Sequence, residues 1–327
     1  MSIAPYIKTY SCDVAIVTSI HGIDYGIIAK TKDVLHDEIP FVEAHSLPSI
    51  FPPDLHVKFA LRTFYTPKRL CVSLVFKADK DEFGRERFCA LSVLLPRDFM
   101  IFCLDPRKIF DQLGISWKDL KDIKTKKQAI ALENKIKDKM FKVKPMTEQE
   151  ILNYSSLLHQ SSKKLLEVFN EKLELVLSEL LSSRHKLIIS ASTKTVNLET
   201  IWANNSSIEV ISSILTVLPP PLRMQITFSS IAYDTNSEIS RIIFVPPEFI
   251  VPRDTTYSIF YLEGEERKIR TSKEAKILAK LVEKSADELT EELELLHLLS
   301  LSYYLTSRYK KQKEFSRFLE LIRKLVK

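Results

Sequence analysis

The chain has 327 residues, of which 45% are hydrophobic and 28% are charged, with a net charge of +6. These proportions are typical of a globular protein with a packed core, and the length suits one large domain or two ordinary ones. No stretch approaches the roughly 18 apolar residues of a membrane helix, and the N-terminus lacks the basic start of a signal peptide, so we expect a cytoplasmic protein.

The first third of the chain reads as strands joined by short connections, which favours antiparallel pairing. A turn-like tetrapeptide at 21–24 divides the first two strands, and the charged loop 79–85 suits a hairpin. Residues 32–56 contain four prolines and predict an irregular excursion. The predicted strands cover 12–20, 25–31, 57–65, 69–78 and 86–95.

Helical signals follow residue 96. Asp105 as cap, Pro106 in the first turn and Gly114 as stop predict a short helix over 105–114. The lysine-rich residues 116–140 predict a helix or a linker. Thr147 and Glu150 then fit a capping box that opens a long amphipathic pattern to about residue 183, with a break expected near 159–162.

The rest of the chain alternates strands and helices. Strands are predicted at 186–192, 225–230, 241–246 and 257–262, and helices at 207–219, 272–287, 289–306 and 310–326. The order predicts an α/β or α+β fold: an antiparallel sheet first, an α/β core second and a C-terminal helical segment last. We place the units at 1–115, 116–146 (a lysine-rich linker or helix), 147–270 and 271–327.

Composition excludes the common nucleotide sites. Only five glycines occur, and neither phosphate-binding glycine motif is present. The four cysteines are scattered in or beside apolar runs, with no CxxC pair, and we interpret them as buried reduced thiols. We therefore predict no cofactor, no metal site and no catalytic residue set.

The histidines are candidates for catalytic or metal-binding groups. His21 and Asp24 lie in the first turn, where a hydrolase could present a catalytic pair, but no nucleophile-elbow pattern accompanies them. Residues 36–45 hold two histidines and three acids without metal-ligand spacing, and we interpret them as a surface loop. A cryptic hydrolase remains an alternative hypothesis.

Charged residues at loops are the candidate partner contacts. Asp79, Asp81, Glu82 and Arg85 form the tip of the predicted hairpin, which is either simply solvated or a recognition element. Arg223 lies between a helix end and a strand. It either binds helix carbonyls or contacts a partner.

Two basic segments could bind an acidic partner, nucleic acid or an anionic membrane. Residues 116–145 hold ten lysines and four acids, and residues 307–327 hold eight basic residues and two acids. Such segments are otherwise solvated helix faces. The candidate basic surface consists of Lys121, Lys124, Lys126, Lys127, Lys310, Lys311 and Lys313.

Three short segments, in order, resemble the N-terminal module of prokaryotic GTPase-associated proteins. Residues 21–31 (HGIDYGIIAKT) resemble the opening hairpin of that family. DEFGR at 81–85, with FCALSVLLP two residues later, resembles its next recognisable stretch, and LPPPLRMQITFS at 218–229 resembles its later "LPxxLRxxLxFS" segment.

A second resemblance points the same way. Residues 180–192 (LLSSRHKLIISAS) are similar to a strand of DENN domains, which are exchange factors and adaptors for small GTPases with a longin-like sheet first and an α/β core second. The long acidic and aromatic features of DENN cores are not evident. Together the resemblances imply a non-enzymatic regulator or scaffold of a small Ras-like GTPase. A nucleic-acid or anionic membrane-surface binding module is the alternative.

Overall fold

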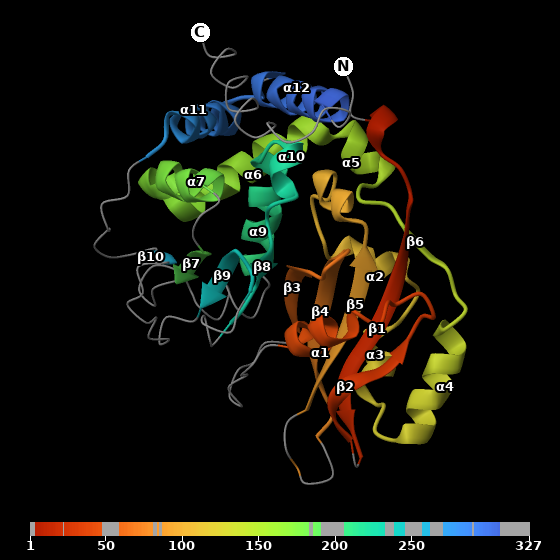
Figure 1. Cartoon of the computed structure of the whole chain (residues 1–327). Helices are drawn as coiled ribbons and strands as arrows, with labels where there is room; N and C mark the ends of the chain where they lie inside the picture. Colours follow the sequence, from red (N-terminus) through yellow and green to blue (C-terminus); the bar gives the residue numbers. More distant parts are fainter. Residues whose placement is uncertain are drawn as a thin grey trace.

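The computed structural model describes residues 4–21, 23–47, 59–80, 84, 87–182, 186–190, 206–232, 239–245, 257–261, 271–289 and 291–307. Within these ranges the chain is a mixed α/β fold with a C-terminal helical segment, as predicted (Figure 1). The strands follow one path, β10-β7-β9-β8-β3-β4-β5-β1-β2, and β6 pairs beside β1. None of the described helices is both long and apolar enough to cross a bilayer.

The first part is an antiparallel sheet, which confirms the predicted strands. After the short helix η1 (Ala4–Tyr6) come β1 (Tyr10–Ile20) and β2 (Ile23–Lys30), followed later by β3 (Phe59–Tyr65), β4 (Leu70–Ala78) and β5 (Arg87–Leu95). Every neighbouring pair in the order β3-β4-β5-β1-β2 is antiparallel.

The irregular excursion predicted for 32–56 is wrong for its described part. Helix α1 (Ile39–Ser46) occupies it, with Pro40 in the first turn, where the missing N–H costs no hydrogen bond. Val42 and Ser46 of α1 are buried against the sheet. Proline there starts the helix rather than preventing it.

The connection after β5 is more regular than the sequence suggested. It contains η2 (Arg97–Ile101), α2 (Lys108–Gln112), α3 (Trp117–Lys121), α4 (Lys126–Ile136) and β6 (Phe141–Val143). The lysine-rich stretch is thus two helices, and β6, which was not predicted, pairs with Tyr10–Cys12 of β1. Helix α2 begins later than predicted, after a turn at 106–107, and the Asp105 carboxylate accepts from the Arg107 N–H over 3.0 Å, as a capping residue does. Gly114, at φ +62°, stops the helix as expected.

The long amphipathic pattern is divided at asparagines. It forms α5 (Glu148–Leu152), α6 (Tyr154–Phe169), η3 (Asn170–Lys172) and α7 (Leu173–Ser182). The capping box is confirmed: Glu150 N–H donates to the Thr147 hydroxyl over 3.2 Å, and Thr147 N–H donates to the Glu150 carboxylate over 2.7 Å. The break predicted near 159–162 is wrong. The chain turns at Asn153 and at Asn170, which adopts a positive φ of 45°.

The second half is parallel. Strand β7 (Lys186–Ser190) lies between β9 (Ile242–Val245) and β10 (Tyr257–Tyr261), and β8 (Phe228–Ser229) completes the order β8-β9-β7-β10. Strand β8 is much shorter than predicted. The helices are α9 (Ser206–Val217), α10 (Pro220–Arg223), α11 (Lys273–Asp287) and α12 (Glu291–Ser307). The helix predicted at 310–326 lies outside the described residues.

Strand β3 joins the two halves through its outer edge. Arg62 pairs antiparallel with Ser229 of β8, and Ser230 N–H donates to Leu61 O over 2.9 Å. Buried hydroxyls complete the edge: Leu61 N–H donates to Ser230 Oγ over 2.8 Å, and Phe228 N–H donates to Thr63 Oγ1 over 2.8 Å. Both halves therefore share one sheet.

A buried polar cluster ties α12 to α6, α9, α10 and η2. Arg223, 1% exposed, donates to the carbonyls of Leu218 (2.9 Å) and Ile101 (3.1 Å) and to the Tyr154 hydroxyl (2.9 Å). The hydroxyl lies 2.7 Å from Nδ1 of His297 on α12, and Nε2 of that ring lies 2.9 Å from Val217 O. The tautomer that satisfies every group carries its proton on Nε2.

The His297 cluster makes stability depend on pH. Burial, and then the charge of Arg223, lower the pKa of His297 well below 6.5, so the ring is neutral in the folded protein. An unfolded chain binds a proton there as pH falls below about 6.5, which stabilises the unfolded state. We expect this residue to lower the free energy of unfolding by about 1.4 kcal/mol per pH unit below that value.

Urea unfolding of the full chain across this pH range measures the slope. His297→Gln keeps an amide in the cluster but cannot titrate, so its slope should be shallower by that amount. Equal slopes in the two proteins would contradict the assignment.

Candidate functional site

A buried arginine gathers three connections at one end of the antiparallel sheet. Arg87, at the start of β5 and 2% exposed, donates to backbone carbonyls: Asp79 after β4 (3.1 Å), Ser19 near the end of β1 (2.9 Å), Lys121 at the end of α3 (2.8 Å) and Ile123 just beyond. A guanidinium has five donors in a fixed fork, so one side chain can hold several carbonyls. The whole group is called the Arg87 loop cluster: Ser19, His21, Asp79, Arg87, Lys121, Ile123 and Lys124.

Backbone bonds inside the Arg87 loop cluster hold the same segments together. His21 N–H donates to Lys124 O over 2.9 Å, and Asp79 N–H lies 3.4 Å from Lys121 O. The Thr125–Gln128 capping box then starts α4 directly after Lys124, with Gln128 Oε1 accepting from Lys124 N–H over 3.0 Å. Because these bonds hold the segments next to one another, the segments form one continuous surface.

The exposed side chains of this surface carry opposite charges. Lys124 Nζ lies 3.0 Å from the Asp79 carboxylate, and both side chains are about half exposed. The hydrogen bond from Lys124 lowers the pKa of Asp79, so its carboxylate stays ionised. His21 is exposed beside them. A surface of this kind can recognise a charged partner through its loops.

The structure brings together only part of the predicted site. His21, Asp79, Lys121 and Lys124 meet in the Arg87 loop cluster, and Asp24 is exposed nearby on β2. Lys126 and Lys127 are exposed on α4. Arg223 is buried and bonded to helix carbonyls, which fits its structural alternative. The remaining predicted residues lie outside the described ranges: Asp81, Glu82, Arg85, Lys310, Lys311 and Lys313.

Sequence reasoning missed two members of this end of the sheet. Arg87 looked like an ordinary strand residue, because its role depends on carbonyls up to 68 positions away. Tyr25, on β2, is 48% exposed, and its hydroxyl accepts from Phe88 N–H over 3.1 Å. An exposed aromatic side chain held in place is a common centre of protein–protein binding. The sequence feature that could have identified Tyr25 is its position next to the predicted turn at 21–24.

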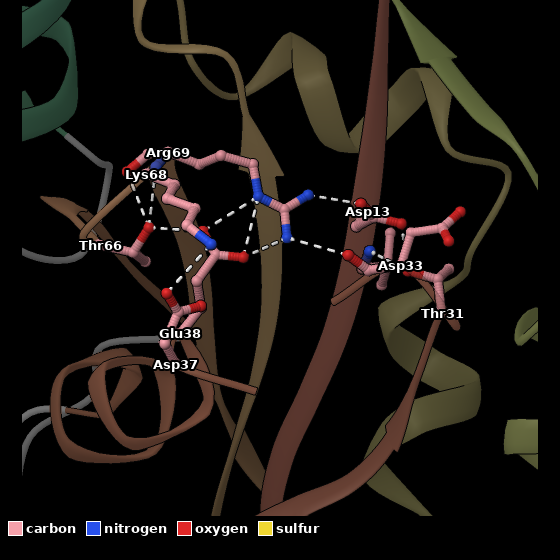
Figure 2. Close-up of polar contacts among 9 residues, drawn as sticks. Asp13, Thr31, Asp33, Asp37, Glu38, Thr66, Lys68 and Arg69 are labelled. Atoms are coloured by element: carbon pink, nitrogen blue, oxygen red, sulfur yellow. Dashed lines mark hydrogen bonds and ion pairs between the residues drawn. The ribbon is translucent and has the colours of Figure 1, made fainter. Parts of the chain in front are cut away.

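A second ionic cluster lies where β3 turns into β4 (Figure 2). Arg69 Nε donates to both Glu38 oxygens over 3.0 Å, and its terminal nitrogens contact Glu38 and Asp13. Thr66 Oγ1 donates to Glu38 over 2.7 Å, and Thr31 Oγ1 donates to Asp13 over 2.7 Å. The arginine thus joins β1, the link before α1 and the β3–β4 turn.

The contacts of Arg69 show that the interpretation of Glu38 as part of a surface loop is wrong. Glu38 was placed in a surface loop, but its side chain is fully buried. Burial alone would raise the pKa of Glu38, but hydrogen bonds from Arg69 and Thr66, with the guanidinium charge, lower it overall. Neither this cluster nor any other part of the described chain holds three residues placed to bind a metal ion.

Removing Arg69 should show how much its charge stabilises the fold around the buried Glu38 carboxylate. Arg69→Met leaves the buried Glu38 carboxyl without its cation, so it must keep an unpaired charge or take up a proton, and we expect a loss of about 3–5 kcal/mol in the free energy of unfolding. The double variant Arg69→Met/Glu38→Gln should recover much of that loss, because the uncompensated charge is gone. Denaturant unfolding of both proteins measures the difference. A double variant less stable than Arg69→Met alone would contradict this reading.

No protein-family model matches the chain, and no curated protein matches it. The function is therefore inferred from the residues and their geometry, together with the short resemblances in the sequence.

Proposed function

We propose that the protein is a non-enzymatic regulator or scaffold that binds a small Ras-like GTPase through the Arg87 loop cluster and the adjoining Tyr25. The observation that carries the proposal is the buried Arg87, which holds three connections so that His21, Asp79 and Lys124 share one surface. A preorganised surface loses little conformational entropy when a partner binds.

The resemblance to GTPase-associated proteins is the reason to propose a small GTPase as the partner. Its first matched segment, 21–31, contains β2, and the second continues into β5. Both flank the Arg87 loop cluster. An antiparallel sheet followed by an α/β core is also the arrangement that the DENN resemblance implies. These observations support a GTPase partner in the cytoplasm.

The reactive groups of the described core favour binding over nucleophilic chemistry. Burial raises the pKa of Cys12, Cys71 and Cys89 to about 12, so these thiols are protonated at neutral pH. His297 is sealed inside the fold with both ring nitrogens engaged. An exchange factor or scaffold needs only a preference for one conformation of the GTPase switch segments.

Direct binding to a panel of small Ras-like GTPases, each loaded with GDP or a non-hydrolysable GTP analogue, tests the proposal. We expect at least one to bind the full chain with a preference for one nucleotide state. Release of a fluorescent GDP from that GTPase then separates an exchange factor from a scaffold. Failure of the whole panel to bind, together with salt-sensitive RNA binding, would overturn the proposal in favour of the nucleic-acid alternative.

Tyr25→Ala should weaken that binding by at least about tenfold, because an aromatic anchor at the centre of an interface is commonly worth more than 1.4 kcal/mol. Tyr6→Ala is the matched control, since Tyr6 is similarly exposed at 41% but lies on η1. Tyr25→Phe keeps the ring and should bind nearly as the parent does. Equal losses in Tyr25→Ala and Tyr6→Ala would place the interface elsewhere.

A further inference from the structure

Helix α4 presents an exposed basic flank on the outside of the molecule. The helix packs beside β2, away from the parallel half of the sheet (Figure 1). Ala129 and Ile136 are buried against the core. Spacings of four and seven residues align Lys126, Ile130 and Lys137 on a different side, with Lys127 adjoining them one turn before Ile130. These four residues are called the α4 flank.

The lysines of the α4 flank are not neutralised by the fold. Lys126, Lys127 and Lys137 are exposed, and no carboxylate of the described residues pairs with any of them. The acids nearby are engaged elsewhere or recessed: Asp138 lies 4.0 Å from Lys32, and Glu133 is half-buried. The flank therefore presents a net positive charge to solvent.

Apolar side chains accompany this charge. Ile130 is 49% exposed in the middle of the α4 flank, and Met140, in the link from α4 to β6, is 74% exposed. Lysines beside exposed aliphatic side chains offer the two contacts that a membrane interface takes: charge for the anionic headgroups and apolar groups for the acyl boundary.

The chemistry of this face favours lipid over nucleic acid. No arginine occurs between residues 108 and 183, whereas bidentate phosphate and base recognition relies on arginine. Phe141, the aromatic residue next to the helix, is buried and offers no base-stacking platform. Lysine acts as a point charge and suits a diffuse anionic surface.

We propose that the α4 flank docks the protein on the anionic surface of a lipid bilayer, with the lysines over the headgroups and Ile130 entering between them. The Arg87 loop cluster ends where α4 begins, so docking holds that surface close to the bilayer. This inference does not depend on the identity of any protein partner.

Co-sedimentation of the full chain with vesicles tests the inference. Vesicles of equal parts phosphatidylcholine and phosphatidylserine should bind the protein, and pure phosphatidylcholine vesicles should not. Each lysine near such a surface raises partitioning about fivefold, so Lys126→Gln/Lys127→Gln/Lys137→Gln should lower it on the order of a hundredfold. Ile130→Ser should lower partitioning roughly threefold or more while retaining its salt dependence.

A matched variant controls for net charge. Lys163→Gln/Lys273→Gln/Lys280→Gln removes three exposed lysines of α6 and α11 for which the described residues supply no carboxylate partner, and it should bind vesicles nearly as the parent does. Thermal unfolding by circular dichroism checks that both triple variants fold. Equal losses in the two variants, no binding to anionic vesicles, or flank-dependent binding to single-stranded RNA without vesicle binding would each overturn the inference.

Discussion

The outer edge of β3 is the constraint on which the rest of the structure depends. An exposed strand edge carries unpaired backbone groups, and burying it requires a partner for each of them. Strand β8 supplies one paired position at Arg62, and the hydroxyls of Thr63 and Ser230 supply what the short strand cannot. Because this junction completes the antiparallel sheet, it also fixes where the parallel half of the sheet begins.

Buried or partly buried arginines bind carbonyls at the ends of three helices, a place where many helices have a glycine. Only five glycines occur in the chain, and Gly114 is the one that stops a described helix by its positive φ. The last carbonyls of α3, α9 and α7 are instead bound by Arg87, Arg223 and Arg241. A cation at that end also opposes the negative pole of the helix. Three arginines thus bind backbone carbonyls in the last turns of these helices.

Much of the fold could be predicted from the sequence, because strand alternation and capping signals are local. The β strands of the first part and the Thr147 capping box are of this kind. The predictions were wrong where the structure depends on contacts between residues far apart in the sequence. Glu38, for example, is buried because Arg69 reaches it from 31 residues away. The candidate site could be predicted in part, because its exposed charged residues lie in predicted turns. Arg87 binds the carbonyls that bring the site together, and the sequence around it does not indicate this role.

Helices closed by distant arginines have a consequence for folding. Arg87 and the carbonyl of Lys121 are 34 residues apart, and Arg241 and the carbonyl of Leu180 are 61 apart. A glycine cap forms as soon as its own helix does, whereas these caps form only after the sheet has brought remote segments together. Helix ends and strand pairing are therefore completed together, and these long-range contacts add to the contact order, on which the folding rate depends.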